Sequence, residues 1–315
     1  MLRAVLDHQE FFVPQSSKPT QPLGQLSLFG VLPSPAQSRS DLANALLEHR
    51  YDDASRGLQE LLDMRHPDGP AFADVLQTLT AIRGIQGHPD AGQGDAVQAV
   101  ALMEGLVQQL RALVGPHVDS FARFLWSELA VQFAHLPFSK DAFKAHAGWM
   151  HLQAGDSRRA WAAFDGVNAA QVSREAVEAI VLAGFGAGGA SCGWSPLCWH
   201  AWRWPEATRS LIERVDDADI GVLARAFICD CDLGLDWFPA WAITQESGLG
   251  VFLRRAVGGR EAELRSEPQQ CAVAAYDLVI AELGGANRVE KRKRLQAMNG
   301  WVYGEYMRVV EQSVR

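Results

Sequence analysis

One stretch, from Phe143 to Val167, constrains the fold of this chain more than any other. Apolar and small residues recur at helical spacing on both sides of a central Gly155-Asp156-Ser157. They are Ala145, Gly148, Trp149 and Leu152 on the first side and Ala160, Trp161, Phe164 and Val167 on the second. Gly155 can adopt the left-handed conformation that ends a helix, and Asp156 or Ser157 can cap the next helix. The stretch therefore predicts two amphipathic helices joined by a tight turn.

Two further segments, 50–62 and 203–215, repeat the pattern of the second helix. A large residue is followed by a small one at +3, and an apolar residue follows four positions after the small one, with a further apolar residue beyond it. These positions are Tyr51, Ala54, Leu58 and Leu61 in the first segment and Trp204, Ala207, Leu211 and Ile212 in the second. The separations between copies are unequal, whereas an even array of such units repeats about every 34 residues. The sequence therefore predicts degenerate or interrupted repeats.

The stretch resembles the helix-turn-helix unit of the tetratricopeptide family. The matching positions are Gly148, Gly155, Ala160 and Phe164. The match departs from the family at three positions, with Lys144 in place of a large aromatic residue, His151 in place of Tyr and Val172 in place of Pro. The resemblance implies a solenoid of helix hairpins whose concave surface binds a protein or peptide.

We accordingly predict an all-α chain with two parts: an extended Pro-rich arm over 1–39 and a helical-repeat domain over 40–315, with a sub-boundary near 184–196. Within the domain, the segment 118–135 has an apolar face wide enough for deep burial. The residues on this face are Phe121, Phe124, Leu125, Leu129 and Phe133.

The bulk composition is that of a folded protein. Of the 315 residues, 48% are hydrophobic and 21% charged, which excludes a disordered chain. A net charge of −8 argues against broad phosphate binding as the main task of the surface. No apolar run approaches the ~18–20 residues of a membrane helix, and the first residues lack the pattern of a signal peptide. We therefore expect a cytoplasmic protein without a membrane partner, whose 5 cysteines are reduced.

The Pro-rich arm contains a short motif, Gln25-Leu26-Ser27-Leu28-Phe29. This pentapeptide resembles the motif by which bacterial replication and repair proteins bind the sliding clamp. In that family the Gln hydrogen-bonds at one small pocket, while the Leu and Phe fill a second, apolar one. The alternative is that Leu26, Leu28 and Phe29 pin the arm to the helical body.

Glycines at 184, 186 and 189 spell the pattern GxGxxG. A dinucleotide site requires a strand before the glycines and a helix directly after them. The residues before Gly184 have helical periodicity instead, and Pro196 argues against a helix that continues past it. We therefore expect a hinge or loop at 184–189, and an enzyme with a cofactor site there is a weaker alternative.

Three tryptophans, Trp199, Trp202 and Trp204, gather within six residues. Such a cluster is either a structural core element or a partner-binding surface, since Trp is enriched at interaction hot spots. The nearby Cys198 with His200, and Cys229 with Cys231, lack the spacing of a zinc site. We predict neither a metal nor a cofactor.

A basic run, Lys291-Arg292-Lys293-Arg294, precedes several aromatic residues near the C-terminus. This combination suits a contact with nucleic acid or an acidic partner. The alternative is the solvated face of a terminal helix.

The histidines are scattered, and the chain contains no serine elbow, phosphate loop or H-E-x-x-H motif. The sequence therefore favours a non-catalytic adaptor or scaffold subunit of a bacterial-type assembly, which binds a protein through its concave surface, its tryptophans or its arm. The alternative is a DNA-maintenance or phage-defence accessory factor that docks on the sliding clamp through residues 25–29 and contacts nucleic acid through residues 291–294.

Overall fold

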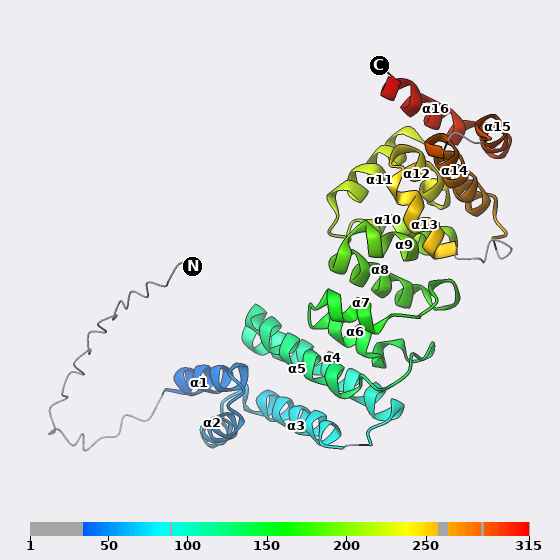
Figure 1. The fold of residues 1–315 in the computed structure, drawn as a ribbon. Helices are drawn as coiled ribbons and strands as arrows, with labels where there is room; N and C mark the ends of the chain where they lie inside the picture. The colour runs from blue at the N-terminus through cyan, green and yellow to red at the C-terminus, as the bar shows by residue number, and fades with distance from the viewer. Residues whose placement is uncertain (1–33, 89, 258–263, 285–286, 315) are drawn as a thin grey trace, which may run out of the picture.

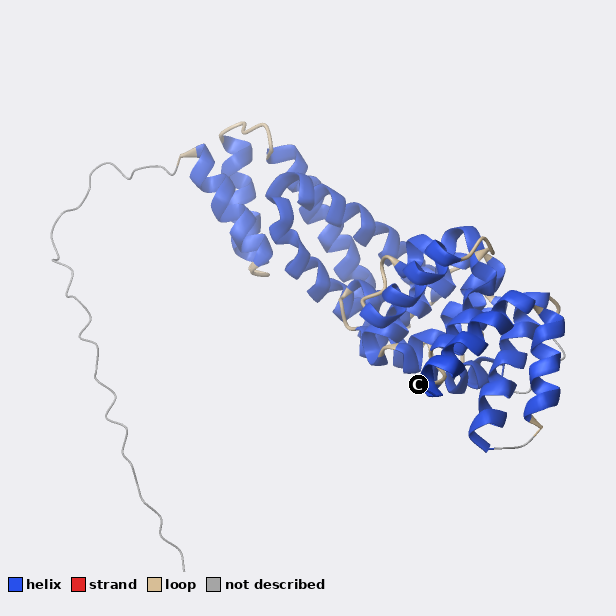
Figure 2. Cartoon of the chain, turned by 90° about the horizontal axis from the view of Figure 1, so that it is seen from above, coloured by secondary structure: helices blue, strands red, loops and turns tan. Residues whose placement is uncertain are grey.

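The computed structural model describes residues 34–88, 90–257, 264–284 and 287–314, and within these ranges every regular element is a helix (Figure 2). The all-α prediction is therefore confirmed. The first helices are α1 (Pro35–Leu47), α2 (Tyr51–Asp63), α3 (Gly69–Gln86), α4 (Gln93–Val114), α5 (Val118–Gln132), α6 (Ala147–Gln153), α7 (Ser157–Ala163) and α8 (Arg174–Gly188). The others are α9 (Ala190–Arg203), α10 (Pro205–Ile212), α11 (Ala218–Asp230), α12 (Phe238–Gln245), α13 (Gly248–Val257), α14 (Glu267–Gly284), α15 (Arg288–Met298) and α16 (Gly300–Val314).

The helices stack in chain order. Each one packs against the next along the sequence, and the ribbon rises from α1 at one end to α16 at the other (Figure 1). Contacts between helices further apart in the sequence join α13 to α9 and α12 to α14 and α16. Packing between sequence neighbours is the arrangement that helical-repeat chains use to bury the apolar face of each hairpin.

The apolar interior consists of two clusters of buried side chains. One extends from Leu42 to Met150, and the other from Ala160 to Tyr306. The fully buried side chains divide at the turn between α6 and α7, while Trp149 and Leu152 of α6 are partly buried against the second cluster. Residues 184–196 lie well inside the second cluster, where α8 packs against α9.

The hairpin predicted from the sequence is present as α6 and α7. Gly155 closes the first helix with a φ of 80°, and the Asp156 side chain accepts a hydrogen bond of 3.0 Å from the Arg159 amide. The ring of Phe164, the residue that follows α7, lies directly against Gly148, where a Cβ would come within 2.8 Å of it. The glycine therefore allows the two helices to approach closely, although each is only one to two turns long.

The predicted boundary of the arm is displaced. The first helix begins at Pro35 rather than at Ser40, because the Ser34 hydroxyl caps it and proline is well tolerated in the first turn. Residues 35–39 are therefore helical. The motif at 25–29 lies outside the described residues.

The expectation of a loop at 184–189 is wrong. Helix α8 continues through Gly188, and the chain turns into α9 at Gly189, which has a φ of 59°. At Gly184 a Cβ would meet the Gly193 Cα at 2.9 Å, so the two helices touch backbone to backbone. The glycines serve this helix contact rather than a phosphate loop.

The expectation that Pro196 ends a helix is also wrong, because α9 continues to Arg203. A proline inside a helix costs about 3 kcal/mol, since one backbone hydrogen bond is lost and the ring crowds the preceding turn. Large apolar side chains on both sides of it, Trp194 and Leu197, are almost completely buried. Their burial offsets the local cost, so tertiary packing overrides the propensity.

The glycine contact between α8 and α9 gives a first prediction. Replacing Gly184→Ala places a methyl group against the backbone of Cys192 and Gly193, which cannot yield as a side chain would. We expect overpacking of about 1–3 kcal/mol to exceed the gain of about 0.5–1 kcal/mol from the better helix former. The free energy of unfolding, measured by urea denaturation, should therefore be lower for Gly184→Ala than for the wild type.

Gly105→Ala in α4 is the matched control, because a Cβ at this position would meet no atom within 4 Å. That variant should be slightly more stable than the wild type. An unchanged or higher stability for Gly184→Ala would contradict the close contact.

Candidate interaction site

One face of α5 is largely uncovered by the residues that the structure describes. It carries Phe124, Ser127, Glu128, Val131 and Gln132, which follow one another at the spacing of a single helix face. Together with Gln86 from the end of α3 they line a hollow of about 430 Å³. The exposed fractions of Phe124 and Val131 are 45% and 65%, so two large apolar side chains face solvent within two helical turns.

The opposite face of α5 holds the helix in place. Phe121, Leu125, Trp126 and Leu129 are buried in the first apolar cluster. Phe124 lies on the other face, which the described residues leave largely open, so the prediction that it is deeply buried is wrong. An exposed apolar face of this kind is typical of a surface that contacts another molecule.

The turn between α1 and α2 forms a wall beside this face. The ring of His49 lies 4.2 Å from the ring of Phe124, and its Nδ1 is 3.0 Å from the Tyr51 hydroxyl. The guanidinium of Arg83 stacks over the Tyr51 ring at 3.6 Å. This network fixes the position of Phe124 from one side.

Glu128 is the anionic group on this face of α5. Burial lowers the pKa of His49, although Glu128 opposes this effect, and burial raises the pKa of Tyr51. Both groups are therefore neutral near pH 7. Glu128 has no ion-pair partner in the described part of the chain, so its carboxylate is available to a cation.

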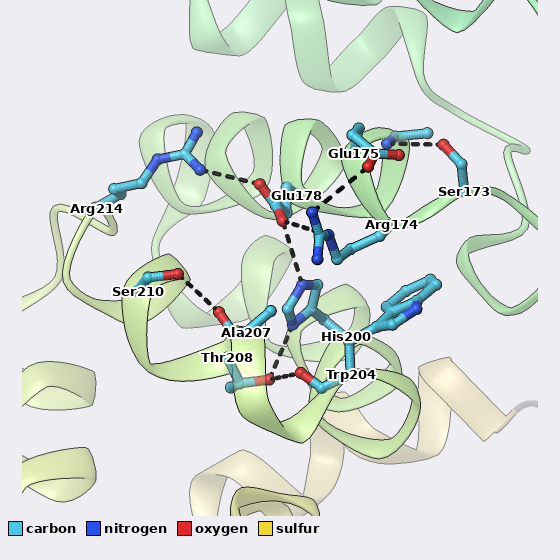
Figure 3. Close-up of polar contacts among 11 residues, drawn as sticks. Ser173, Arg174, Glu175, Glu178, His200, Trp204, Ala207, Thr208, Ser210 and Arg214 are labelled. Atoms are coloured by element: carbon cyan, nitrogen blue, oxygen red, sulfur yellow. Dashed lines mark hydrogen bonds and ion pairs between the residues drawn. The ribbon is translucent and has the colours of Figure 1, made fainter.

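A second arrangement of polar side chains joins α8, α9 and α10 (Figure 3). His200 Nδ1 lies 2.9 Å from the Thr208 hydroxyl, and its Nε2 lies 3.7 Å from a carboxylate oxygen of Glu178. The order hydroxyl, imidazole, carboxylate is that of a nucleophilic triad. The geometry does not suit nucleophilic catalysis. His200 and Thr208 are 0% exposed, so a substrate cannot reach them. The Thr208 hydroxyl also donates its proton to the Trp204 carbonyl at 3.0 Å rather than to the imidazole.

This polar cluster instead ties three helices together. Glu178 also forms ion pairs with Arg174, at 3.4 Å, and with Arg214, at 3.0 Å. Arg214 lies in the turn that follows α10. Burial lowers the pKa of His200, and the neighbouring Glu178 opposes the shift. The neutral imidazole donates from Nδ1 to Thr208, which leaves the buried Nε2 without a hydrogen-bond partner.

The structure places the three predicted tryptophans mainly in the core. Trp199 and Trp202 are 7% and 9% exposed and pack edge to face, with ring centroids 5.2 Å apart. Trp204 is half-buried beneath the guanidinium of Arg203, 4.1 Å from its ring centroid. The cluster has the structural role that the sequence left open.

The basic run lies on α15 and is largely neutralised by α14. Lys291 and Arg294 pair with Asp277 at 3.1 and 3.4 Å, and Arg292 pairs with Glu282 at 2.6 Å. Lys293 has no ion pair among the described residues and is exposed. Three of the four cations therefore hold two helices together.

The cysteines and histidines form no metal site in the described ranges, where no group of three or more His, Cys, Asp or Glu side chains could hold an ion. All cysteines in this part of the chain are free thiols. The glycines at 184–189, in α8 and its end, offer no phosphate-binding loop.

Comparison with known proteins gives no match: no protein-family model, curated protein or solved structure is similar to this chain. Among the helices of the described residues, none has the length and apolar character needed to span a bilayer.

The buried histidines give a second prediction. Because burial lowers the pKa of His49, His146, His151 and His200 in the folded chain, the unfolded chain takes up protons first as the pH falls below about 6.5. The free energy of unfolding should therefore decrease between pH 7.5 and 5.5. Urea unfolding at both pH values measures it.

His200→Gln should reduce this pH dependence, because one of the linked groups is removed. The exposed His88→Gln is the matched control for the loss of an imidazole. An identical pH dependence in the His200 variant and the wild type would show that burial of this imidazole does not contribute.

Proposed function

We propose that this chain is a protein–protein adaptor that binds a segment of a partner protein on the uncovered face of α5. The exposed pair Phe124 and Val131, beside a hollow of about 430 Å³, is the observation that carries the proposal. The resemblance of α6 and α7 to a tetratricopeptide hairpin supports it, because that family binds protein segments.

The face indicates the chemistry of the partner segment. Phe124 and Val131 are seven residues apart, which is about 10 Å along a helix, and Glu128 lies between them. An amphipathic helix with two apolar residues at matching spacing and a Lys or Arg between them would complement this row. The apolar residues would supply affinity, and the cation would pair with Glu128.

A charge placed on this face gives the third prediction. Val131→Asp should abolish partner binding while leaving the fold intact, because Val131 is 65% exposed and contributes little to the core. Tagged protein from the native host is compared with the variant by mass spectrometry, and each candidate partner is then tested in purified form.

Val251→Asp is the matched control, since Val251 is 50% exposed on the distant α13. The proposal requires a partner that is retained by the control, lost by Val131→Asp and bound directly by the purified wild type. If the wild type and Val131→Asp retain the same proteins, the face of α5 is not the binding site.

We propose a second candidate function, docking on the bacterial sliding clamp through Gln25-Leu26-Ser27-Leu28-Phe29. All five residues agree with the clamp-binding pattern, and they stand in a Pro-rich segment that precedes α1. The accompanying contact with nucleic acid receives less support, since three of the four basic side chains at 291–294 are paired with α14.

Purified clamp provides the fourth test. Leu28→Ala/Phe29→Ala protein should lose binding to it, because these side chains would fill the apolar pocket on the clamp. Calorimetry or fluorescence polarisation measures the affinity, and Val131→Asp should bind the clamp as well as the wild type does. If the wild type does not bind the clamp, this second function is excluded.

A further inference from the structure

A small hollow of about 170 Å³ lies between α7, the turn that follows it, α8 and α9. Helix α8 packs against both α7 and α9 in the middle of the stack (Figure 1). Pockets for drug-sized ligands measure about 300–1,000 Å³, whereas a cavity of about 150 Å³ can hold a benzene ring. The hollow therefore has room for one small chemical group.

The lining of this hollow is rich in aromatic side chains. Trp161 comes from α7, Phe164 directly follows α7, and Trp199 comes from α9. The buried Ile180 and Pro196 add apolar surface. Trp161 is partly exposed, and its ring pairs with no other aromatic ring in the described part of the chain. The surface of this ring is therefore available to a ligand.

The charge of the hollow is negative. Asp165 is the only charged residue among the described residues that line it, and its exposed carboxylate forms no ion pair with any of them. His146, whose ring stacks on Phe164 at 5.4 Å, is neutral near pH 7, because burial lowers its pKa. The faces of aromatic rings are electron-rich and attract cations. The carboxylate and the rings therefore favour the same kind of ligand, a cation.

The turn that carries Asp165 is ordered by contacts of its own. Gly166 adopts a φ of 78°, which allows the chain to turn tightly after α7. Arg203 on α9 donates hydrogen bonds to the carbonyls of Ala169 and Val172, at 3.1 and 2.9 Å. Its guanidinium thus holds the turn from outside the hollow, which it does not line. A site that is ordered in advance loses less entropy when a ligand binds.

The lining also distinguishes among cations. No group of three or more His, Cys, Asp or Glu side chains within the described ranges could hold a metal ion. The ammonium group of lysine is strongly hydrated and needs partners for its three N–H donors. A quaternary ammonium group has no N–H, and aromatic residues are the usual lining of sites that bind it.

We propose that this hollow binds the trimethylammonium group of a ligand. The methyl groups contact the rings of Trp161, Phe164 and Trp199, and Asp165 lies beside the positive charge. Such groups occur on free molecules such as choline and on methylated lysine side chains of proteins. The site is separate from the face of α5 and from residues 25–29, so it does not depend on the functions proposed for them.

Two pairs of ligands test the proposal on wild-type protein. The first pair is choline and its uncharged isostere, in which a tert-butyl group replaces the trimethylammonium group. The second is a short peptide with one trimethyl-lysine and the same peptide with unmodified lysine. NMR titration of the indole signals should show at least about fivefold tighter binding of the trimethylammonium ligand in one pair.

The pair with the tighter ligand identifies the source of the group, a free molecule or a modified protein. The proposal is overturned if the trimethylammonium ligand binds no more tightly than its control in either pair.

Variants then locate the site. Asp165→Asn should weaken binding of the tighter ligand at least about threefold, because the charge beside it is removed. Trp161→Leu keeps an apolar side chain but removes the aromatic ring, so it should weaken the trimethylammonium ligand more than its control. Both side chains are at least partly exposed, and circular dichroism checks that the variants remain folded.

Asp74→Asn, at an exposed position on the distant α3, is the matched control and should bind like the wild type. Val131→Asp on α5 should also bind the ligand normally, whatever its effect on a partner protein. Unchanged affinity in both Asp165→Asn and Trp161→Leu would show that the ligand binds elsewhere and would refute the assignment of this hollow.

Discussion

The close approach of α8 and α9 is the contact on which the centre of the molecule depends. Because Gly184 and Gly193 carry no side chains, the two backbones touch, and the ring of Phe185 lies directly against Gly193. This approach places α9 so that His200 reaches Glu178 on α8 and Thr208 on α10. The position of α10 then sets one wall of a hollow that it forms with α11.

The polar cluster around His200 shows how burial and hydrogen bonding compete at this centre. A buried polar atom without a hydrogen-bond partner costs about 1–3 kcal/mol, which applies to Nε2 of His200. The nearby Trp194 and Leu197 are nearly inaccessible, and each large apolar side chain contributes about 1.5–3 kcal/mol when fully buried. Burial of these apolar side chains therefore opposes the cost of the incomplete polar network.

Local features of the sequence predicted the α6–α7 hairpin well, because Gly155 and Asp156 act on residues only a few positions away. The same reasoning failed at Pro196, where the stabilising contacts come from other helices. It also placed Phe124 in the core, since helical periodicity identifies an apolar face but not whether a neighbour covers it. The charges at 291–294 could be recognised in the sequence, but their partners Asp277 and Glu282 lie on the preceding helix and became visible only in three dimensions.

The division of the apolar interior at the α6–α7 turn has a consequence for how the chain loses its structure. Side chains of the first cluster, up to Met150, are shielded mainly by one another, as are those from Ala160 onward. In stacked chains the cooperativity between neighbouring units depends on the interface that joins them. Here that interface passes through two helices of seven residues each. We therefore expect the amino-terminal helices to melt as a unit of their own, so that no single melting temperature describes the whole chain.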